Sequence, residues 1–222
     1  MRVAVTRAAP EAEHTARRVR DRGHEAIVAP LLSIVPCAFD TNTENVQAVL
    51  ITSMNGARAL AALSGELPAL AVGDATADTA RAAGFKRVHS AGGDVRALAA
   101  LAKAMLQPDA GKLLHLSGDH VAGDLASDLA PAGFVVERRI AYLAEPAPRL
   151  PAAYHDRLDM VLFHSARAAE IYVGLGAPGA AGRTAACLSP FVAAAAAKAP
   201  WAALIVAPQP RESALLDIAL PV

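Results

Sequence analysis

Short hydrophobic segments alternate along the whole chain with longer segments in which apolar residues recur every three to four positions. The helical spacing of Ala12, Ala16 and Val19 is one example. This alternation predicts strands at residues 2–7, 48–52, 69–72, 86–89, 112–116, 159–164, 185–188 and 202–206. It predicts helices at residues 11–22, 55–63, 74–83, 94–106, about 121–131, 166–174, 190–198 and 211–219. Strands that alternate with helices favour parallel sheets covered by helices on both faces.

The same order of elements occurs in both halves of the chain, which indicates a duplication. In each half the first strand leads into a helix closed by glycine, Gly23 or Gly133, and then into an extended segment, 26–35 or 134–143. Breaks at Asp40 to Asn45 and in the proline-rich segment 144–151 fit a chain that crosses between lobes twice, near residues 36 and 144. We therefore expect two similar α/β lobes that face a ligand between them.

Small hydroxyl residues follow the predicted strands in both halves. They are Thr6, Ser53, Thr76, Ser117, Ser165 and Ser189. Ligands of parallel sheets bind at the carboxyl ends of the strands, where these residues lie. Serine and threonine before a helix are also ordinary N-caps, each worth roughly 1 kcal/mol. Both interpretations stay open, because the free amides of a capped turn can themselves hold an anion.

Charge and hydropathy narrow the class of protein. The chain has 21 basic and 21 acidic residues with no lysine–arginine block, which argues against nucleic acid as the main partner. Although 54% of the residues are hydrophobic, no apolar run reaches the roughly 18–20 residues of a membrane span. The first residues lack the apolar stretch of a signal peptide, so we expect a cytoplasmic protein without a membrane partner.

Cofactor and metal signatures are absent from the sequence. It contains no GxGxxG after a strand, no GxxxxGK[ST], no GxSxG and no HExxH. Cys37 and Cys187 lie far apart without ligand spacing and are expected to be reduced. Asp94 is expected to cap a helix. His115 and His164 fall in predicted strands, where structural histidines are the more common interpretation.

Taken together, several stretches resemble the uroporphyrinogen-III synthase family. They are VTRAAPEAEHTARRVRDRGHEAIVAPLLSI, VLITSMNGARAL, ALAVGDATADTARAAGF, LLHLSGDHVAGDLASDLAPAGFVVERRIAYLAEP and VLFHSARAAEIY. The resemblance spans nearly the whole chain in the family's order. It implies an α/β fold of two similar lobes, each a parallel sheet flanked by helices, joined by a two-stranded β-ladder hinge. One lobe would hold residues 1–35 and 143–222 and the other 36–142, with ladder segments at about 26–36 and 134–146.

The resemblance also implies an activity. The substrate would be hydroxymethylbilane, which the enzyme would cyclise to uroporphyrinogen III with loss of water and inversion of ring D. No metal or organic cofactor would be needed, the protein would be a monomer, and hydroxymethylbilane synthase would be a transient partner. The alternative is a non-catalytic two-lobed protein that binds a small anion.

Individual site residues follow from the resemblance position by position. Tyr142 is the candidate catalytic residue, placed to assist departure of the hydroxyl. Ser53, Asn55, Thr76, Ser165 and Arg167 match turns of the family. The set of candidate substrate-binding residues is completed by Thr6, Arg7, Ser117, Gly118 and Ser189, at or next to the other predicted strand ends. Many members have a Gly-x-Thr-Thr-like turn where this chain has Leu188-Ser-Pro-Phe-Val192, so Ser189 would substitute for a threonine there.

Overall fold

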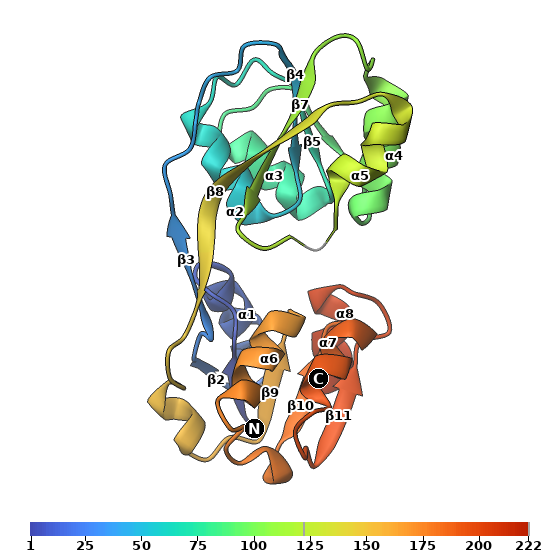
Figure 1. Cartoon of the computed structure of the whole chain (residues 1–222). Coiled ribbons are helices and arrows are strands. Elements are labelled where there is room, and N and C mark those ends of the chain that lie inside the picture. The colour runs from blue at the N-terminus through green and yellow to red at the C-terminus, as the bar shows by residue number, and fades with distance from the viewer. Residues whose placement is uncertain (122, 222) are drawn as a thin grey trace. The chain divides into compact units, whose positions relative to one another are not determined.

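The computed structural model describes residues 1–121 and 123–221. The chain forms two compact units (Figure 1). Unit 1 holds Met1–Ser33 and Glu145–Val222, and unit 2 holds Ile34–Ala144. No described helix has the length and apolar character needed to cross a membrane.

Unit 1 contains a five-stranded parallel sheet. Its order is β11 (Ala203–Val206), β10 (Thr184–Cys187), β9 (Met160–Phe163), β1 (Arg2–Val5) and β2 (Glu25–Val28). Its helices are α1 (Glu11–Arg20), α6 (Ala166–Gly174), α7 (Pro190–Ala196) and α8 (Glu212–Ala219). Short 3-10 turns lie at Ala152–His155 and Ala180–Gly182.

Helices cover both faces of this sheet. Successive side chains of a strand point to opposite faces, and the apolar side chains on each face pack against helices. Val3 and Val5 pack with α1 and α8 on one face, whereas Ala4 packs with α6 and α7 on the other. Since both faces are buried, the strands consist almost entirely of apolar residues.

The second sheet belongs to unit 2, except at residues 32–33 and 145–146, which belong to unit 1. Its order is β3 (Leu32–Pro36), β8 (Val136–Pro146), β7 (Lys112–Gly118), β4 (Val46–Ile51), β5 (Ala69–Ala71) and β6 (Val88–Ser90). The strands from β8 to β6 are parallel. The helices α2 (Met54–Ala59) and α3 (Asp74–Ala82) cover one face, and α4 (Val95–Met105) and α5 (Leu125–Leu129) cover the other. Short 3-10 turns at Leu60–Ala62 and Ala130–Ala132 extend α2 and α5.

The five strands of the first sheet correspond to five of the six strands of the second, all except β3. The order β2-β1-β9-β10-β11 in unit 1 is matched by β8-β7-β4-β5-β6 in unit 2. Each sheet therefore combines a strand–helix–strand unit from one half of the sequence with three strands from the other half. The predicted α/β fold, with two similar parallel sheets flanked by helices, is confirmed.

The ends of several elements differ from the sequence-based prediction. The extended segment 26–35 is divided at Pro30 into β2 and β3, which belong to different sheets. β8 continues to Pro146, so the predicted linker from residue 144 begins too early. The helix expected at about 121–131 is reduced to α5, and Ala122 lies outside the described residues. Gly23 and Gly133 have φ of 78° and 85°, which confirms the predicted glycine turns after the first helix of each half.

Candidate functional site

Each sheet has a point at which the strand order reverses, and hydroxyl residues lie beside both. In unit 1 this point lies between β1 and β9, which lead into Thr6 and Ser165. In unit 2 it lies between β4 and β7, which lead to Ser53 and Gly118. Open parallel sheets bind ligands in the crevice at such points, beyond the carboxyl ends of the strands. The predicted site residues therefore form two groups, one on each unit.

Tyr142 lies against Ser53 and Gly118 in unit 2. Its hydroxyl is 2.9 Å from Ser53 Oγ, which also accepts a hydrogen bond from the amide of Gly56 at 3.0 Å. β7 pairs with β8 so that Gly118 is opposite Tyr142, after a bulge at Ser117/Gly118. A Cβ at Gly118 would lie 2.5 Å from Tyr142 Cε2, so the absent side chain gives the ring its place. Tyr142 lies within β8, because the strand continues to Pro146, beyond the end of the predicted extended segment 134–143.

A pocket of about 200 Å³ opens beside this tyrosine. It is lined by Thr52, Ser53, Val95, His115, Gly118, His120, Val121, Gly123 and Tyr142. A second pocket of about 280 Å³ shares His115, Val121 and Gly123 with the first and is also lined by Arg138. Each is smaller than the roughly 300–1,000 Å³ of typical ligand sites, so each suits a part of a larger molecule.

His115 is a pocket residue that the sequence analysis treated as structural. Its Nε2 is 3.1 Å from the hydroxyl of Thr52, and only 3% of the residue is exposed. Burial, followed by the positive charge of Arg138, lowers the pKa of His115 to about 4. The imidazole is therefore neutral at physiological pH, able to donate or accept a hydrogen bond without adding charge. One sequence feature could have indicated that His115 belongs to the site: it lies two residues before Ser117 and therefore on the same side of β7.

Loss of His115 is expected to change how stability depends on pH. Because its folded pKa lies below the unfolded value of about 6.5, the unfolded state takes up the proton first. The contribution of His115 is therefore complete above about pH 6.5 and is lost as the pH falls towards 4, by about 3 kcal/mol. Urea unfolding of wild type and His115→Gln at pH 7 and pH 4 measures this. If the free energy of unfolding fell equally in the two proteins between pH 7 and pH 4, the lowered pKa of His115 would be contradicted.

The other predicted residues of unit 2 lie in different environments. Asn55, in the first turn of α2, accepts a hydrogen bond from Arg58 at 2.5 Å. Thr76 is largely buried as the third residue of α3, which Gly73 precedes as N-cap. Ser117 is buried inside β7, where it accepts a hydrogen bond from Arg138 Nε at 2.8 Å. Of the two interpretations left open, capping is excluded for Thr76 and Ser117, because one lies inside a helix and the other inside a strand.

In unit 1 the two serines among the predicted residues act as caps. Ser165 Oγ accepts from the amide of Ala168 at 3.2 Å, and Ser189 Oγ accepts from that of Val192 at 3.3 Å. Capping is confirmed for these two, for Ser53 and for Asp94. Each serine therefore presents the start of a helix at the carboxyl edge of a sheet.

The remaining predicted residues of unit 1 differ from one another. Thr6 is buried and donates to the carbonyl of Leu162 at 2.7 Å, and it does not cap α1. Arg167 follows Ser165 in α6, and its Nη1 is buried without a hydrogen-bond partner among the described residues. Arg7 is 24% exposed and pairs with Glu212 at 3.3 Å. The sequence analysis did not identify Glu212, which is distant in the chain.

Within residues 1–121 and 123–221, no group of three or more histidine, cysteine or acidic residues is arranged to hold a metal ion. Cys187 is buried, which raises the pKa of its thiol to about 12, and both cysteines are free. A protonated thiol is a poor metal ligand and a poor nucleophile.

Comparison with known proteins places the chain in a family. A family model described as Uroporphyrinogen-III synthase HemD matches residues 13–217. The crystal structure of uroporphyrinogen-III synthetase from Helicobacter pylori has a TM-score of 0.70 at 17% identity, with 99% of each chain covered. A mutant uroporphyrinogen III synthase from Thermus thermophilus has a TM-score of 0.57 at 19% identity, over 99% of this chain and 97% of that one. Curated protein sequences give no match.

The two kinds of likeness carry different weight. The solved structures share the fold at low identity, whereas the family match extends over most of the sequence. This chain therefore belongs to the uroporphyrinogen-III synthase family, the cyclising lyases of tetrapyrrole and haem biosynthesis.

Proposed function

We propose that this chain cyclises hydroxymethylbilane to uroporphyrinogen III, with inversion of ring D. The C–O bond of the hydroxymethyl group breaks, and the oxygen leaves as water after gaining a proton. The freed methylene carbon then forms a carbon–carbon bond to ring D. Because ring D is inverted, the bond between ring D and its neighbouring methylene bridge must also break and form again at the other α-carbon of that ring, and the proton lost from the closed ring balances the one taken up by the leaving water. The observation that carries this proposal is the family match over residues 13–217.

Tyr142 is the residue we propose to assist the leaving hydroxyl. Its phenol lines the pocket and is 2.9 Å from Ser53 Oγ, which can hold the phenol in place while it hydrogen-bonds to the substrate. A hydrogen bond to the departing oxygen stabilises the charge that develops as the C–O bond breaks. Hydroxymethylpyrroles lose water readily, so positioning of the reacting carbons can supply most of the control over the product.

The carboxylate arms of the bilane are proposed to bind at both edges described above. Ser53, Ser165 and Ser189 each begin a helix, and the amides of a first helical turn favour an anion. Arg7 and Arg167 add positive charge in unit 1. Thr6, Asn55, Thr76, Ser117 and Gly118 complete the proposed set, with Thr6 and Ser117 acting through the backbone they hold, because both are buried.

We further propose a cytoplasmic monomer that meets hydroxymethylbilane synthase transiently to receive an unstable substrate. The non-catalytic anion-binding alternative is not favoured, because the matching family consists of synthases.

The isomer of the product tests the proposed activity. Coupled with hydroxymethylbilane synthase, the wild-type protein should yield type III uroporphyrinogen. Hydroxymethylbilane synthase without this protein should yield the type I isomer, which forms spontaneously. Separation of the oxidised products by chromatography distinguishes the two. Type I product alone, from a protein whose folding is verified by circular dichroism, would rule out the proposal.

A further inference from the structure

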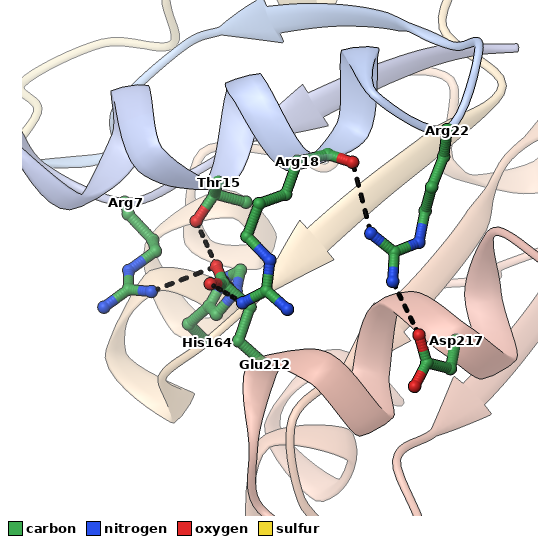
Figure 2. Close-up of polar contacts among 7 residues, drawn as sticks. All are labelled: Arg7, Thr15, Arg18, Arg22, His164, Glu212 and Asp217. Carbon is green, nitrogen blue, oxygen red and sulfur yellow. Dashed lines mark hydrogen bonds and ion pairs between the residues drawn. The ribbon is translucent and has the colours of Figure 1, made fainter. Parts of the chain in front are cut away.

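Glu212 is the centre of a polar cluster at the carboxyl edge of the unit 1 sheet (Figure 2). It is the first residue of α8 and is 18% exposed. Its Oε1 accepts a hydrogen bond from Thr15 and lies 3.3 Å from both Arg7 Nη1 and His164 Nε2. Its Oε2 accepts from Arg18 Nη1 at 2.8 Å. Residues from four separate parts of the chain therefore meet at one carboxylate.

The cluster carries an excess of positive charge. Burial lowers the pKa of His164, so the imidazole is neutral at pH 7. Burial alone would raise the pKa of Glu212, but its contacts with His164 and Thr15 and the charge of Arg7 hold it below its ordinary value. One ionised carboxylate therefore faces two guanidinium groups, Arg7 and Arg18. The remaining charge can attract an anion to this edge.

The contact with Glu212 determines which part of Arg7 is free. Figure 2 shows one terminal nitrogen of Arg7 directed at Glu212 and the other directed away. Neither Nε nor Nη2 of Arg7 makes a hydrogen bond or an ion pair with another described residue. These two nitrogens form one edge of the guanidinium plane, and such an edge can bind both oxygens of a carboxylate at once.

The corresponding place in unit 2 has a different character. The strand β6 and the helix α4 of unit 2 correspond to β11 and α8 of unit 1. The first residue of α4, Val95, is therefore equivalent to Glu212, the first residue of α8. Val95 lines the pocket beside Tyr142. In unit 1 the same place is filled by a carboxylate that holds two arginines, which indicates a binding role there and a reaction pocket in unit 2.

We propose that Glu212 is a positioning residue, which holds Arg7 so that its Nε/Nη2 edge receives a carboxylate arm of the substrate. This inference rests on the proposed function and deepens it. Without the charge of Glu212, Arg7 gains rotamers and turns away, so the enzyme binds the bilane more weakly in both the ground and the transition state. Weaker uniform binding raises KM and leaves kcat nearly unchanged.

Steady-state kinetics of Glu212→Gln test this role. We expect KM for hydroxymethylbilane to rise about tenfold and kcat to stay within about twofold of wild type. In an Arg7→Gln background, Glu212→Gln should change KM by less than about twofold, because the residue it positions is gone. Glu212→Asp, which keeps the charge, should recover part of the affinity. Asp217→Asn is the matched control on the same helix, since it removes an exposed ion pair with Arg22 and should leave both constants unchanged.

Thr15→Val provides a second test if Glu212→Gln folds poorly. It removes one donor to Glu212 and should raise KM about threefold, again only when Arg7 is present. Type III product from wild type together with an unchanged KM in folded Glu212→Gln or Thr15→Val would overturn the positioning role alone. Equal effects of Glu212→Gln with and without Arg7 would also overturn it. Failure of wild type to give type III product would overturn the proposed function and this inference with it.

Discussion

Tyr142→Phe is expected to lower kcat for cyclisation more than tenfold while the fold is retained. The substitution removes one oxygen, which is 2.9 Å from Ser53 Oγ at the edge of the pocket. A residue that assists proton transfer to a leaving group typically contributes a factor of about 10²–10⁴, and the ease with which hydroxymethylpyrroles lose water places this case near the low end. Coupled turnover assays with isomer analysis measure the effect.

Two further variants separate chemistry from folding. Tyr154→Phe removes a buried phenol that donates to the carbonyl of Ala29 at 2.7 Å, so it should lower stability by about 1 kcal/mol and leave kcat unchanged. Gly118→Ala retains the hydroxyl of Tyr142 but places a methyl group against its ring, and should therefore also impair turnover. Near-normal turnover of Tyr142→Phe would remove this residue from the mechanism.

Patterns that repeat over short distances were sufficient to predict much of this site. Ser53, Ser165 and Ser189 each follow a hydrophobic strand and precede a helical pattern, and a cap at that place is a local property of the chain. Thr6 and Ser117 follow the same pattern in the sequence but are buried against neighbouring strands. Whether a strand-end hydroxyl caps a helix depends on where the next helix begins, and hydropathy locates that start poorly.

The residues that the sequence analysis missed act over long separations. Glu212 meets Arg7 across 205 positions, and no local pattern marks a charged residue that will find partners on other strands and helices. His115 had only its strand position as a signal, because its pocket depends on the pairing of β7 with β4. The predicted crossings between lobes, near residues 36 and 144, rest instead on breaks in composition, which are local features of the chain.

Arg183 forms a second long-range network, which lies inside unit 1. It is 6% exposed and directs its guanidinium at four oxygen atoms. Nη1 donates to the Tyr172 hydroxyl at 3.1 Å and to the Pro178 carbonyl at 2.8 Å, and Nη2 donates to the carbonyls of Tyr154 and Asp156 at 3.0 and 2.7 Å. The planar group thus ties the 3-10 turn Ala152–His155 and the loop at Pro178 to the start of β10. A single ammonium group could not make all of these hydrogen bonds.

Arg183→Met is expected to destabilise unit 1 by about 3–5 kcal/mol, because it removes four charge-assisted hydrogen bonds and leaves buried oxygens without donors. For a chain of this size the unfolding midpoint should fall by roughly 10 °C. Trp201, the single tryptophan of the chain, stacks on Tyr172 at 5.3 Å and reports the loss of stability through its fluorescence in urea.

Two control variants accompany this measurement. Arg183→Lys should have an intermediate stability, since one ammonium cannot reach all four acceptors. Arg81→Met, which removes an exposed ion pair in unit 2, should cost less than about 1 kcal/mol. If Arg183→Met were no more costly than Arg81→Met, the network would contribute nothing to the stability of the fold.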